Sequence, residues 1–226
     1  MPAFAAVRPG RERCGGKSFL PRHFHATAYA AVVLAGAYEE CGNRGRFRVR
    51  AGDVLLHNAF DAHLDRIAPQ GATILNLELP GIPTAFAAGH VSDADAIARA
   101  AEHDSPAAVH FLFVQMRATS PTLDDWPDVL AKEIARDQSC RLDHWSQAHG
   151  IVPETISRGF SNVFGTTAAR FRAEARARRA FEQIIRTGTP LADIAALMGF
   201  ADQAHMTRAV RALTGAPPKS WRSGSI

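Results

Sequence analysis

The chain has 226 residues, of which 46% are hydrophobic and 21% are charged, with a formal net charge of +4. This length allows two modest domains with real cores, and no apolar run approaches the roughly 18 residues of a membrane span. The N-terminal stretch MPAFAAVRPGRERCGG has arginines where a signal peptide needs an apolar segment. Three cysteines without metal-type pairing fit reduced thiols. We therefore expect a soluble, cytoplasmic protein.

The first part of the chain alternates apolar and polar residues with period two, and turns such as CGNRG and RAGD interrupt it. This pattern is typical of an all-β unit. Strands are predicted over residues 22–34, 46–50, 54–58 and 73–79. Pro80, Gly81 and Pro83 mark the exit from this unit, which we bound at residues 1–90.

The histidines of the β unit are its best candidates for binding a metal or an organic effector. His23 and His25 are two apart on the strand predicted over residues 22–34, so we expect both side chains to leave from the same face. His63 follows the turn at Gly52, and His57 is nearby. Three neutral imidazoles favour zinc, copper, iron or nickel over magnesium. Contact with an organic effector and packing in the core fit the same residues, so the three roles stay open.

Residues 91–121 are predicted to form a helical connection. Ser92 and Asp93 start one helix, Pro106 starts another, and a third helix is expected over residues 123–137. The apolar run HFLFVQM at 110–116 is a candidate dimer face. Ordinary packing against the β unit explains this run equally well.

Two predicted helix pairs follow, and in each pair a glycine turn separates the two helices. The first covers residues 142–164 with a turn at Gly150, and the second covers residues 190–214 with a turn at Gly199. Thr189 and Pro190 are expected to start the second pair. In each pair the second helix has one apolar face and one polar face. A helix-turn-helix unit that reads DNA has this pattern, and so does a helical hairpin whose polar face is merely solvated.

One continuous helix over residues 167–186 is predicted to join the two pairs. About twenty residues give a length of about 30 Å, close to the roughly 34 Å between successive major-groove faces of B-DNA. From Arg136 onward the chain has 13 Lys and Arg against 7 Asp and Glu, a net of +6, whereas residues 1–135 have a net of −2. The arginines of the joining helix are expected to contact phosphates or to form a solvated face: Arg170, Arg172, Arg176, Arg178 and Arg179.

Residues 122–226 resemble the DNA-binding domain of AraC-type bacterial transcription regulators. The resemblance rests on GIVPETISRGFSNVFGTTAARFRAEARARRAFEQII at 150–185 and on PLADIAALMGFADQAHMTRAVRALTGAPPKSWR at 190–222. It implies two helix-turn-helix units that contact DNA through the second helix of each. The implied contact residues are Glu154, Thr155, Ser157 and Arg158 in the first unit, and Gln203, Ala204, His205 and Arg208 in the second.

Some positions depart from the pattern of that family, including Met206 and Val210, which replace aromatic residues in the second reading helix, and two positions at the first reading helix. Val152 stands where Ser is the usual helix cap, and Gly159 lies inside the first reading helix. Glycine costs a helix about 0.5–1 kcal/mol relative to alanine. We therefore expect the first reading helix to be the looser of the two.

Residues 16–80 resemble, by pattern, the small cupin barrel that AraC-type regulators carry ahead of the DNA-binding half. The segments that carry the resemblance are HFHATAYAAVVLAG and GDVLLHNAFDAH. Metal-binding cupins hold a divalent metal with an HxH pair, a carboxylate and a later histidine, and the matching positions here are His23, His25 and His63. Tyr29 lies near the place of the carboxylate, which is therefore expected to be missing. AraC-type regulators often keep such histidines without a metal.

The sequence thus predicts an α+β protein with a cupin-like β-barrel in residues 1–90, a helical connection and possible dimer interface in 91–121, and a double helix-turn-helix domain in 122–226. We expect a sequence-specific regulator, not an enzyme, that binds double-stranded promoter or operator DNA as a homodimer. Its effector is expected to be a small molecule or a metal such as zinc. We expect the protein not to bind a membrane. The alternative is a metal-dependent cupin enzyme, a dioxygenase or isomerase with a helical assembly domain, and the missing carboxylate argues against it.

Overall fold

The computed structural model describes residues 7–81, 84, 86–120, 125–136 and 140–222. The chain divides into two compact units, with the division between residues 124 and 125. The N-terminal unit is built on an antiparallel sheet and the C-terminal unit is helical, which confirms the α+β class. The predicted boundary at residues 121 and 122 lies outside the described residues. Within the described ranges, no helix combines the length and the apolar character that a membrane span requires.

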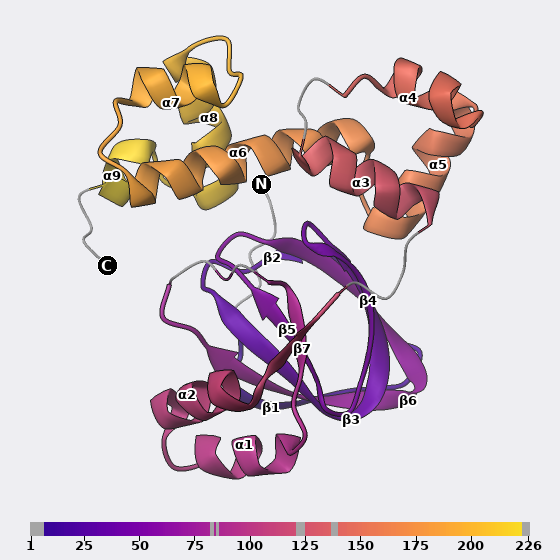
Figure 1. Cartoon of the computed structure of the whole chain (residues 1–226), viewed down its shortest axis with the longest axis vertical. Helices are drawn as coiled ribbons and strands as arrows, with labels where there is room; N and C mark the ends of the chain where they lie inside the picture. Colours follow the sequence, from indigo (N-terminus) through magenta and orange to yellow (C-terminus); the bar gives the residue numbers. More distant parts are fainter. Residues whose placement is uncertain (1–6, 82–83, 85, 121–124, 137–139, 223–226) are drawn as a thin grey trace. The chain divides into compact units, whose positions relative to one another are not determined.

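A curved sheet forms the N-terminal unit (Figure 1). The strands found in the described residues are β1 (Gly10–Cys14), β2 (Phe19–Phe24), β3 (Tyr29–Gly42), β4 (Gly45–Arg50), β5 (Asp53–His57), β6 (Ala62–Glu78), β7 (Ala88–His90) and β8 (Arg117–Thr119). The long strands β3 and β6 pair with each other, β4 and β5 pair with the two halves of β3, and β1 and β2 pair with the two halves of β6. Strands β7 and β8 extend the sheet beyond β5.

The single strand predicted over residues 22–34 is wrong, because the structure has two strands there. Strand β2 ends at Phe24 and β3 begins at Tyr29. Between them, the carbonyl of His25 accepts a hydrogen bond of 2.8 Å from the backbone N–H of Phe60, so this stretch is tied to the turn after β5. His25 therefore follows β2 directly and does not share a strand with His23.

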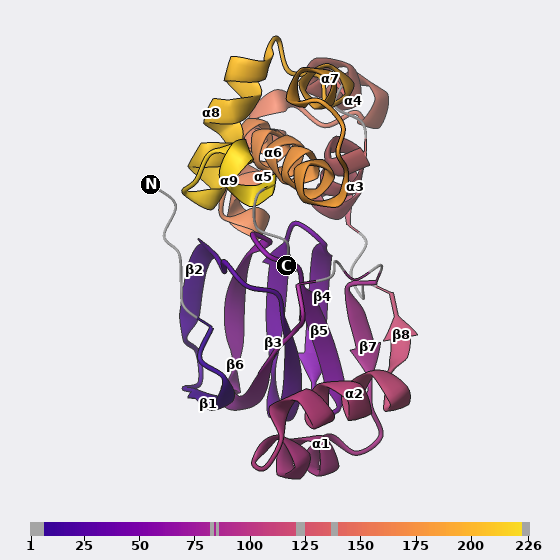
Figure 2. The same cartoon turned by 90° about the vertical axis from the view of Figure 1, so that its left-hand side faces the viewer.

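The two faces of the sheet bury separate cores. On one face, Val32 packs with Ile97 of α1 (Ala94–Ala101) and Leu112 of α2 (Ser105–Gln115). Helices α1 and α2 lie side by side at one end of the sheet in both views (Figures 1 and 2). On the other face, Val33 packs in a cluster with Tyr38. Successive residues of a strand point to opposite faces, and this explains why β3 is buried on both sides.

The predicted starts of α1 and α2 are confirmed. Asp93 accepts a hydrogen bond from the backbone N–H of Ala96, and Asp104 does the same for α2. The apolar run at 110–116 is divided by the helix: Leu112 is fully buried against the sheet, whereas Val114 has 68% of its surface exposed.

Seven helices follow in the described part of the C-terminal unit: α3 (Trp126–Arg136), α4 (Leu142–His149), α5 (Pro153–Phe164), α6 (Ala168–Arg186), α7 (Leu191–Leu197), α8 (Gln203–Thr214) and α9 (Pro218–Arg222). The two predicted helix pairs are α4 with α5 and α7 with α8. Helix α6 runs between them, with α3, α4 and α5 toward its N-terminal end and α7, α8 and α9 toward its C-terminal end (Figure 1). The predicted ends of α3, residues 123 and 137, lie outside the described residues.

Candidate functional site

The first helix pair is held by a glycine turn and an aromatic core. Gly150 has a φ of 63°, a left-handed conformation that ends α4 and turns the chain toward α5. The hydroxyl of Ser146 donates a 2.6 Å hydrogen bond to the carbonyl of Ile151, which fixes the turn. Val152 occupies the N-cap of α5 without a side-chain hydrogen bond, as the departure from the family pattern implied.

Gly159 has a packing role that the sequence did not indicate. A Cβ built at this position would lie 2.5 Å from Cζ2 and 2.8 Å from Cη2 of the Trp126 indole. Real Cβ atoms do not approach a neighbour so closely, so glycine is what allows α3 to pack against α5. The glycine therefore fixes a helix contact, which gives a reason for it other than a loose reading helix.

The variant Gly159→Ala is expected to destabilise the C-terminal unit by about 1–3 kcal/mol, despite the better helix propensity of alanine, because overpacking forces the indole to shift. All three tryptophans lie in this unit, so the unfolding curve followed by tryptophan fluorescence reports on it alone. Gly188→Ala is the matched control, since a Cβ there would meet nothing within 4 Å. Equal stability of the two variants would contradict the packing role.

The second helix pair is built in the same way. Gly199 has a φ of 68° at the turn, and Phe200 beyond it is buried. The carboxylate of Asp202 caps α8 by accepting a 2.6 Å hydrogen bond from the backbone N–H of His205. Helix α7 begins at Leu191 with Pro190 at its N-cap and no side-chain hydrogen bond there, so the predicted capping by Thr189 is wrong.

The exposed faces of α5 and α8 carry the residues that the sequence assigned to DNA contact. Their inner faces bury apolar side chains, such as Phe160 in α5 and Met206 in α8. Seven of the eight assigned residues are exposed: Glu154, Thr155, Ser157, Arg158, Gln203, Ala204 and Arg208. His205 is half-buried, with its ring edge against Phe200 at 5.2 Å between centroids. Their contact with DNA stays a prediction.

Three arginines of α6 bind backbone carbonyls of neighbouring segments within the unit. Arg172 donates a hydrogen bond to the carbonyl of Cys140, ahead of α4. Arg179 donates to the carbonyl of Arg136 at 3.3 Å, at the end of α3. Arg176 donates to the carbonyl of Gly199 at 3.2 Å and lies over the ring of Phe200.

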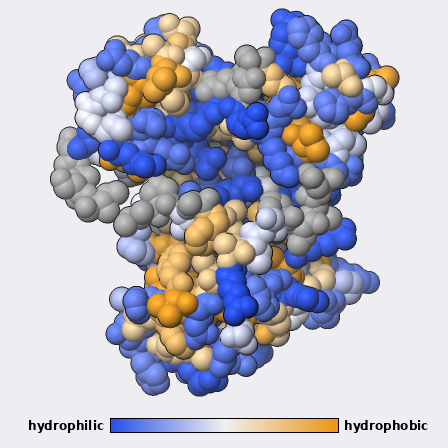
Figure 3. All heavy atoms as spheres, in the orientation of Figure 1, coloured by the Kyte–Doolittle hydropathy of each residue, from blue (hydrophilic) through white to orange (hydrophobic). Residues whose placement is uncertain are grey.

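These contacts give three of the α6 arginines a role within the unit that the sequence did not indicate, and phosphate contact by the α6 arginines stays a prediction. The carbonyl of Arg136 lies at the C-terminal end of α3, where carbonyls lack partners within the helix, and the guanidinium of Arg179 supplies a donor to it. Arg170 and Arg178 pair with glutamates one turn later on α6. The middle of the unit is hydrophilic on the face shown in Figure 3, yet three of the five arginines hold helices to α6.

The N-terminal unit contains a cavity of about 450 Å³. One part of its wall is apolar and includes Ala31, Ile67 and Ile74. The polar lining includes histidines, carboxylic acids and tyrosines from β2, β3 and β6 and from the segment after β2: His23, His25, His63, Glu40, Asp65, Tyr29 and Tyr38. Such a combination of apolar wall and convergent polar groups is typical of a small-molecule site.

Strand register brings the polar residues together. His23 on β2 lies directly opposite His63 on β6. Tyr29 lies opposite His57, and Glu40 lies opposite Asp65. Opposed residues of antiparallel strands project from the same face, and so do residues two apart on a strand. Tyr29 and Glu40 are an odd number of positions apart on β3, and the register shifts between Val33 and Tyr38 allow both to line the same cavity.

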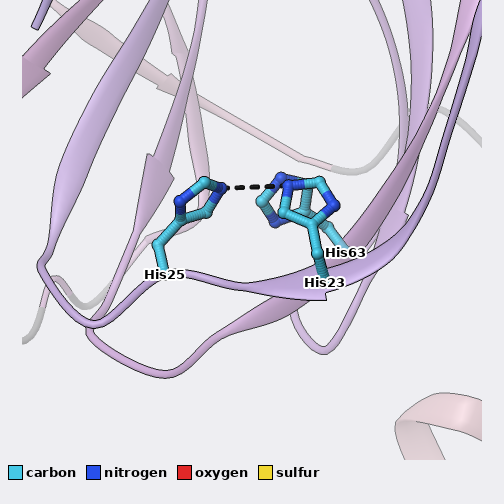
Figure 4. A group of neighbouring side chains, drawn as sticks. All are labelled: His23, His25 and His63. Atoms are coloured by element: carbon cyan, nitrogen blue, oxygen red, sulfur yellow. Dashed lines mark hydrogen bonds between the residues drawn. The ribbon is translucent and has the colours of Figure 1, made fainter. Parts of the chain in front are cut away.

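The three histidines predicted as metal ligands do lie together (Figure 4). The Nε2 atoms of His23 and His25 are 3.0 Å apart, and the ring centroids of His23 and His63 are 4.4 Å apart. Nδ1 of His23 lies 2.8 Å from the carbonyl oxygen of Pro21, which favours the tautomer that leaves a lone pair on Nε2. One ligand atom from each residue lies within 4.8 Å of the others, so these histidines could hold a metal ion.

The group of His23, His25 and His63 contains no carboxylate, as the sequence led us to expect. The hydroxyl of Tyr29 lies 3.3 Å from Nε2 of His63. However, Glu40 from the distant half of β3 brings Oε2 to 3.4 Å from Nε2 of His57. A carboxylate thus lies beside His57, in a second group with His63, outside the group of three predicted histidines.

Burial determines the charge states of this cluster. It lowers the pKa of His57 and of His63 well below the ordinary range, so both imidazoles are neutral and keep a lone pair. Burial, reinforced by the neighbouring Asp65, raises the pKa of Glu40 well above its usual value. Burial also raises the pKa of Asp65, to about 7. Without a cation, the two carboxyl groups favour a protonated form.

The variant Asp65→Asn is expected to stabilise the metal-free N-terminal unit above pH 7, because it removes a buried carboxylate. The folded-state pKa is raised from 3.8 to about 7, so the wild type loses stability as the pH rises through that window. Each pKa unit corresponds to about 1.4 kcal/mol, which predicts a gain of a few kcal/mol for the variant. Calorimetry at pH 4 and pH 8 measures this gain, with the exposed Asp95→Asn as control. A gain of the same size at pH 4 would contradict the assignment.

Sequence reasoning missed Glu40 and Asp65 and assigned no role to His57. Glu40 follows Tyr38 by two positions and shares its buried face, but EE at 39–40 is equally compatible with a solvated strand. The only available signal was a charged residue at an otherwise apolar period-two position. The pairing of Glu40 with Asp65 depends on a register across 25 residues of chain, which local pattern does not fix.

Comparisons with known proteins bear mainly on the C-terminal unit. Residues 145–224 match the family model described as a helix-turn-helix domain. This segment is a helix-turn-helix domain, the kind of domain that the residues at 150–185 and 190–222 predicted. No curated protein sequence matches the chain.

Several solved structures are similar to this chain. The C-terminal domain of AraT, a response regulator from Geobacillus stearothermophilus, is 19% identical with a TM-score of 0.41, covering 45% of this chain and 87% of that domain. An AraC-type transcriptional regulator from Chromobacterium violaceum is 19% identical with a TM-score of 0.39, covering 42% and 86%. ToxT from Vibrio cholerae is 7% identical with a TM-score of 0.43, covering 96% and 97%.

Proposed function

We propose that the chain is a sequence-specific transcription regulator of the AraC type, with two helix-turn-helix units that read DNA through α5 and α8. The observation that carries the proposal is the division of these two helices into a buried apolar face and an exposed polar face. The helix-turn-helix match over residues 145–224 supports the same class. Direct readout would use side chains with paired donors or acceptors, such as Arg158, Gln203 and Arg208.

The length of α6 supports simultaneous reading by both helices. Its 19 residues span about 28 Å, close to one turn of B-DNA. The arginine contacts to Arg136, Cys140 and Gly199 stiffen the connection, since each holds a neighbouring segment to α6. A stiff spacer of this length favours contact with two successive major-groove faces by one chain.

The N-terminal unit, in this proposal, is a cupin-like barrel that binds the effector. Its cavity of about 450 Å³ has the size of a small-molecule site. His23, His25 and His63 line it and would bind a small molecule or a transition metal such as zinc. Effector binding would then bias which arrangement of the two units is populated, and so change the affinity for DNA.

Pairing into a homodimer is part of the proposal, because regulators that read repeated half-sites gain affinity from two linked contacts. Phe113 and Val114 of α2 are two of the exposed large apolar residues described in the N-terminal unit, and they lie next to each other in the run predicted as a dimer face. Sedimentation of the free chain and of the variant Val114→Glu measures the pairing. A monomeric wild type would remove the dimer from the proposal.

Selection of genomic fragments by the purified full chain, followed by footprinting, tests the function directly. The expected footprint has two protected segments on one face of the duplex, with centres roughly 10 base pairs apart. Uniform retention of all fragments, with affinity that depends only on salt, would indicate non-specific charge attraction and would overturn the proposal.

A further inference from the structure

A second group of metal-ligating side chains lies beside the cavity histidines. Glu40, His57 and His63 each offer one ligand atom, and these atoms lie within 4.8 Å of one another. All three residues are buried, with 5%, 4% and 3% of their surfaces exposed. His57 does not line the cavity, whereas Glu40 and His63 do.

The spacing of the closest pair suits a tetrahedral metal. Nε2 of His57 and Oε2 of Glu40 are 3.4 Å apart. Bonds of about 2.0–2.1 Å from zinc to nitrogen or oxygen give a tetrahedral edge of about 3.3 Å. Two neutral imidazoles and one carboxylate are also a donor set that zinc accepts in proteins.

Two buried nitrogen atoms in this group lack hydrogen-bond partners in the part of the chain that the structure describes. Among the described residues, neither Nε2 of His57 nor Nδ1 of His63 has a hydrogen-bond partner. An unpaired buried nitrogen is unfavourable, so such atoms indicate a ligand. The ring of His57 is held by stacking on Tyr29, with centroids 4.4 Å apart and planes at 14°, so this nitrogen is aimed by its surroundings.

We propose that Glu40, His57 and His63 bind one divalent transition-metal ion, with zinc as the best fit, and that Glu40 supplies the carboxylate ligand. His63 belongs to both groups and can serve one centre at a time. Occupancy of this site leaves His23 and His25 to line the cavity, where they contact an organic effector. The metal site does not depend on DNA binding, whereas the part assigned to His23 and His25 rests on the proposed function.

Zinc titration of the metal-free, untagged full chain against a competing chelator tests the site. Glu40→Gln and His57→Phe keep the size of each side chain, and His57→Phe also keeps a ring to stack on Tyr29. Each should lower zinc affinity about 100-fold or more, whereas His25→Ala should leave it within about threefold. Loss of zinc in His25→Ala with retention in Glu40→Gln would place the metal in the cavity group and overturn the proposal, and so would failure of the wild type to bind one zinc per chain.

X-ray absorption of the zinc-loaded wild type needs no substitution. It therefore distinguishes the two groups of candidate ligands even if a variant fails to fold. Two imidazoles and at least one oxygen ligand are expected around the metal. Three imidazoles would overturn the proposal in favour of His23, His25 and His63. Loss of DNA binding would leave either zinc result unchanged, so failure of the metal site and failure of the regulator function are distinguishable.

Discussion

A chain that carries both Arg158→Ala and Arg208→Ala is expected to bind its operator about 100-fold or more weakly than the wild type, because each contact to a base contributes about 1–3 kcal/mol. Both side chains lie on the exposed faces of α5 and α8, away from the buried rows of these helices. Stability should change little, since neither side chain packs in the core. Fluorescence anisotropy with a labelled operator fragment at fixed salt measures the effect.

The matched control removes the same charge from the other unit. Arg99 and Arg117 are exposed residues of the N-terminal unit, and their joint replacement by alanine should change operator affinity only slightly. If Arg158 and Arg208 contact bases, the variant with Arg158→Ala and Arg208→Ala should also lose more affinity for the operator than for unrelated DNA. Equal losses for the two double variants would reduce the assigned contacts to general charge attraction.

Phe160→Ala is expected to have the largest effect on stability, a loss of about 3–5 kcal/mol in the C-terminal unit. Phe160 is fully buried, and its ring lies 4.8 Å from Phe164 and 5.4 Å from Phe171 between centroids. This cluster joins α5 to α6, so the substitution removes the packing that holds α5 against α6. A typical domain is stable by only about 5–15 kcal/mol, and the variant should unfold at much lower urea concentration.

Tryptophan fluorescence follows this transition because Trp126, Trp145 and Trp221 all lie in the C-terminal unit. Leu197→Ala, at a leucine that is 70% exposed, should change stability by less than about 0.5 kcal/mol. If the Phe160→Ala variant is as stable as this control, the aromatic cluster does not stabilise the packing of α5 on α6. The calorimetric transition of the N-terminal unit serves as an internal reference.

Helices of the C-terminal unit were predictable because their signals are local. Gly150, Gly165, Gly199 and Gly215 all have positive φ and end helices where the sequence placed a stop. Amphipathic spacing then identified the buried faces of α5 and α8. The role of Gly159 was not predictable in this way, because the Trp126 ring that it accommodates is far away in sequence.

Strand pairing set the limit of prediction in the N-terminal unit. The break between β2 and β3 and the short strands β1, β7 and β8 carry weak local signals, since their position depends on partners distant in sequence. The three predicted histidines do converge, although His25 follows β2 instead of lying on it. Glu40 joins them only through the long pairing of β3 with β6, a register that one sequence does not reveal.

The roles of the α6 arginines show why composition alone misleads. A net positive charge and a row of arginines favour phosphate contacts, yet three of these side chains donate to backbone carbonyls. One donor of each of these side chains is used within the unit, and we expect the salt dependence of DNA binding to reflect fewer phosphate contacts than the count of arginines implies.

Insertion of five base pairs between the two segments protected in the footprint tests the central claim, that a stiff α6 sets α5 and α8 on successive turns of one face of the duplex. Half a helical turn moves the second segment to the opposite face, and affinity for the full chain should fall about 100-fold, toward that of a single half-site. Unchanged affinity for the DNA with the insertion would contradict the claim.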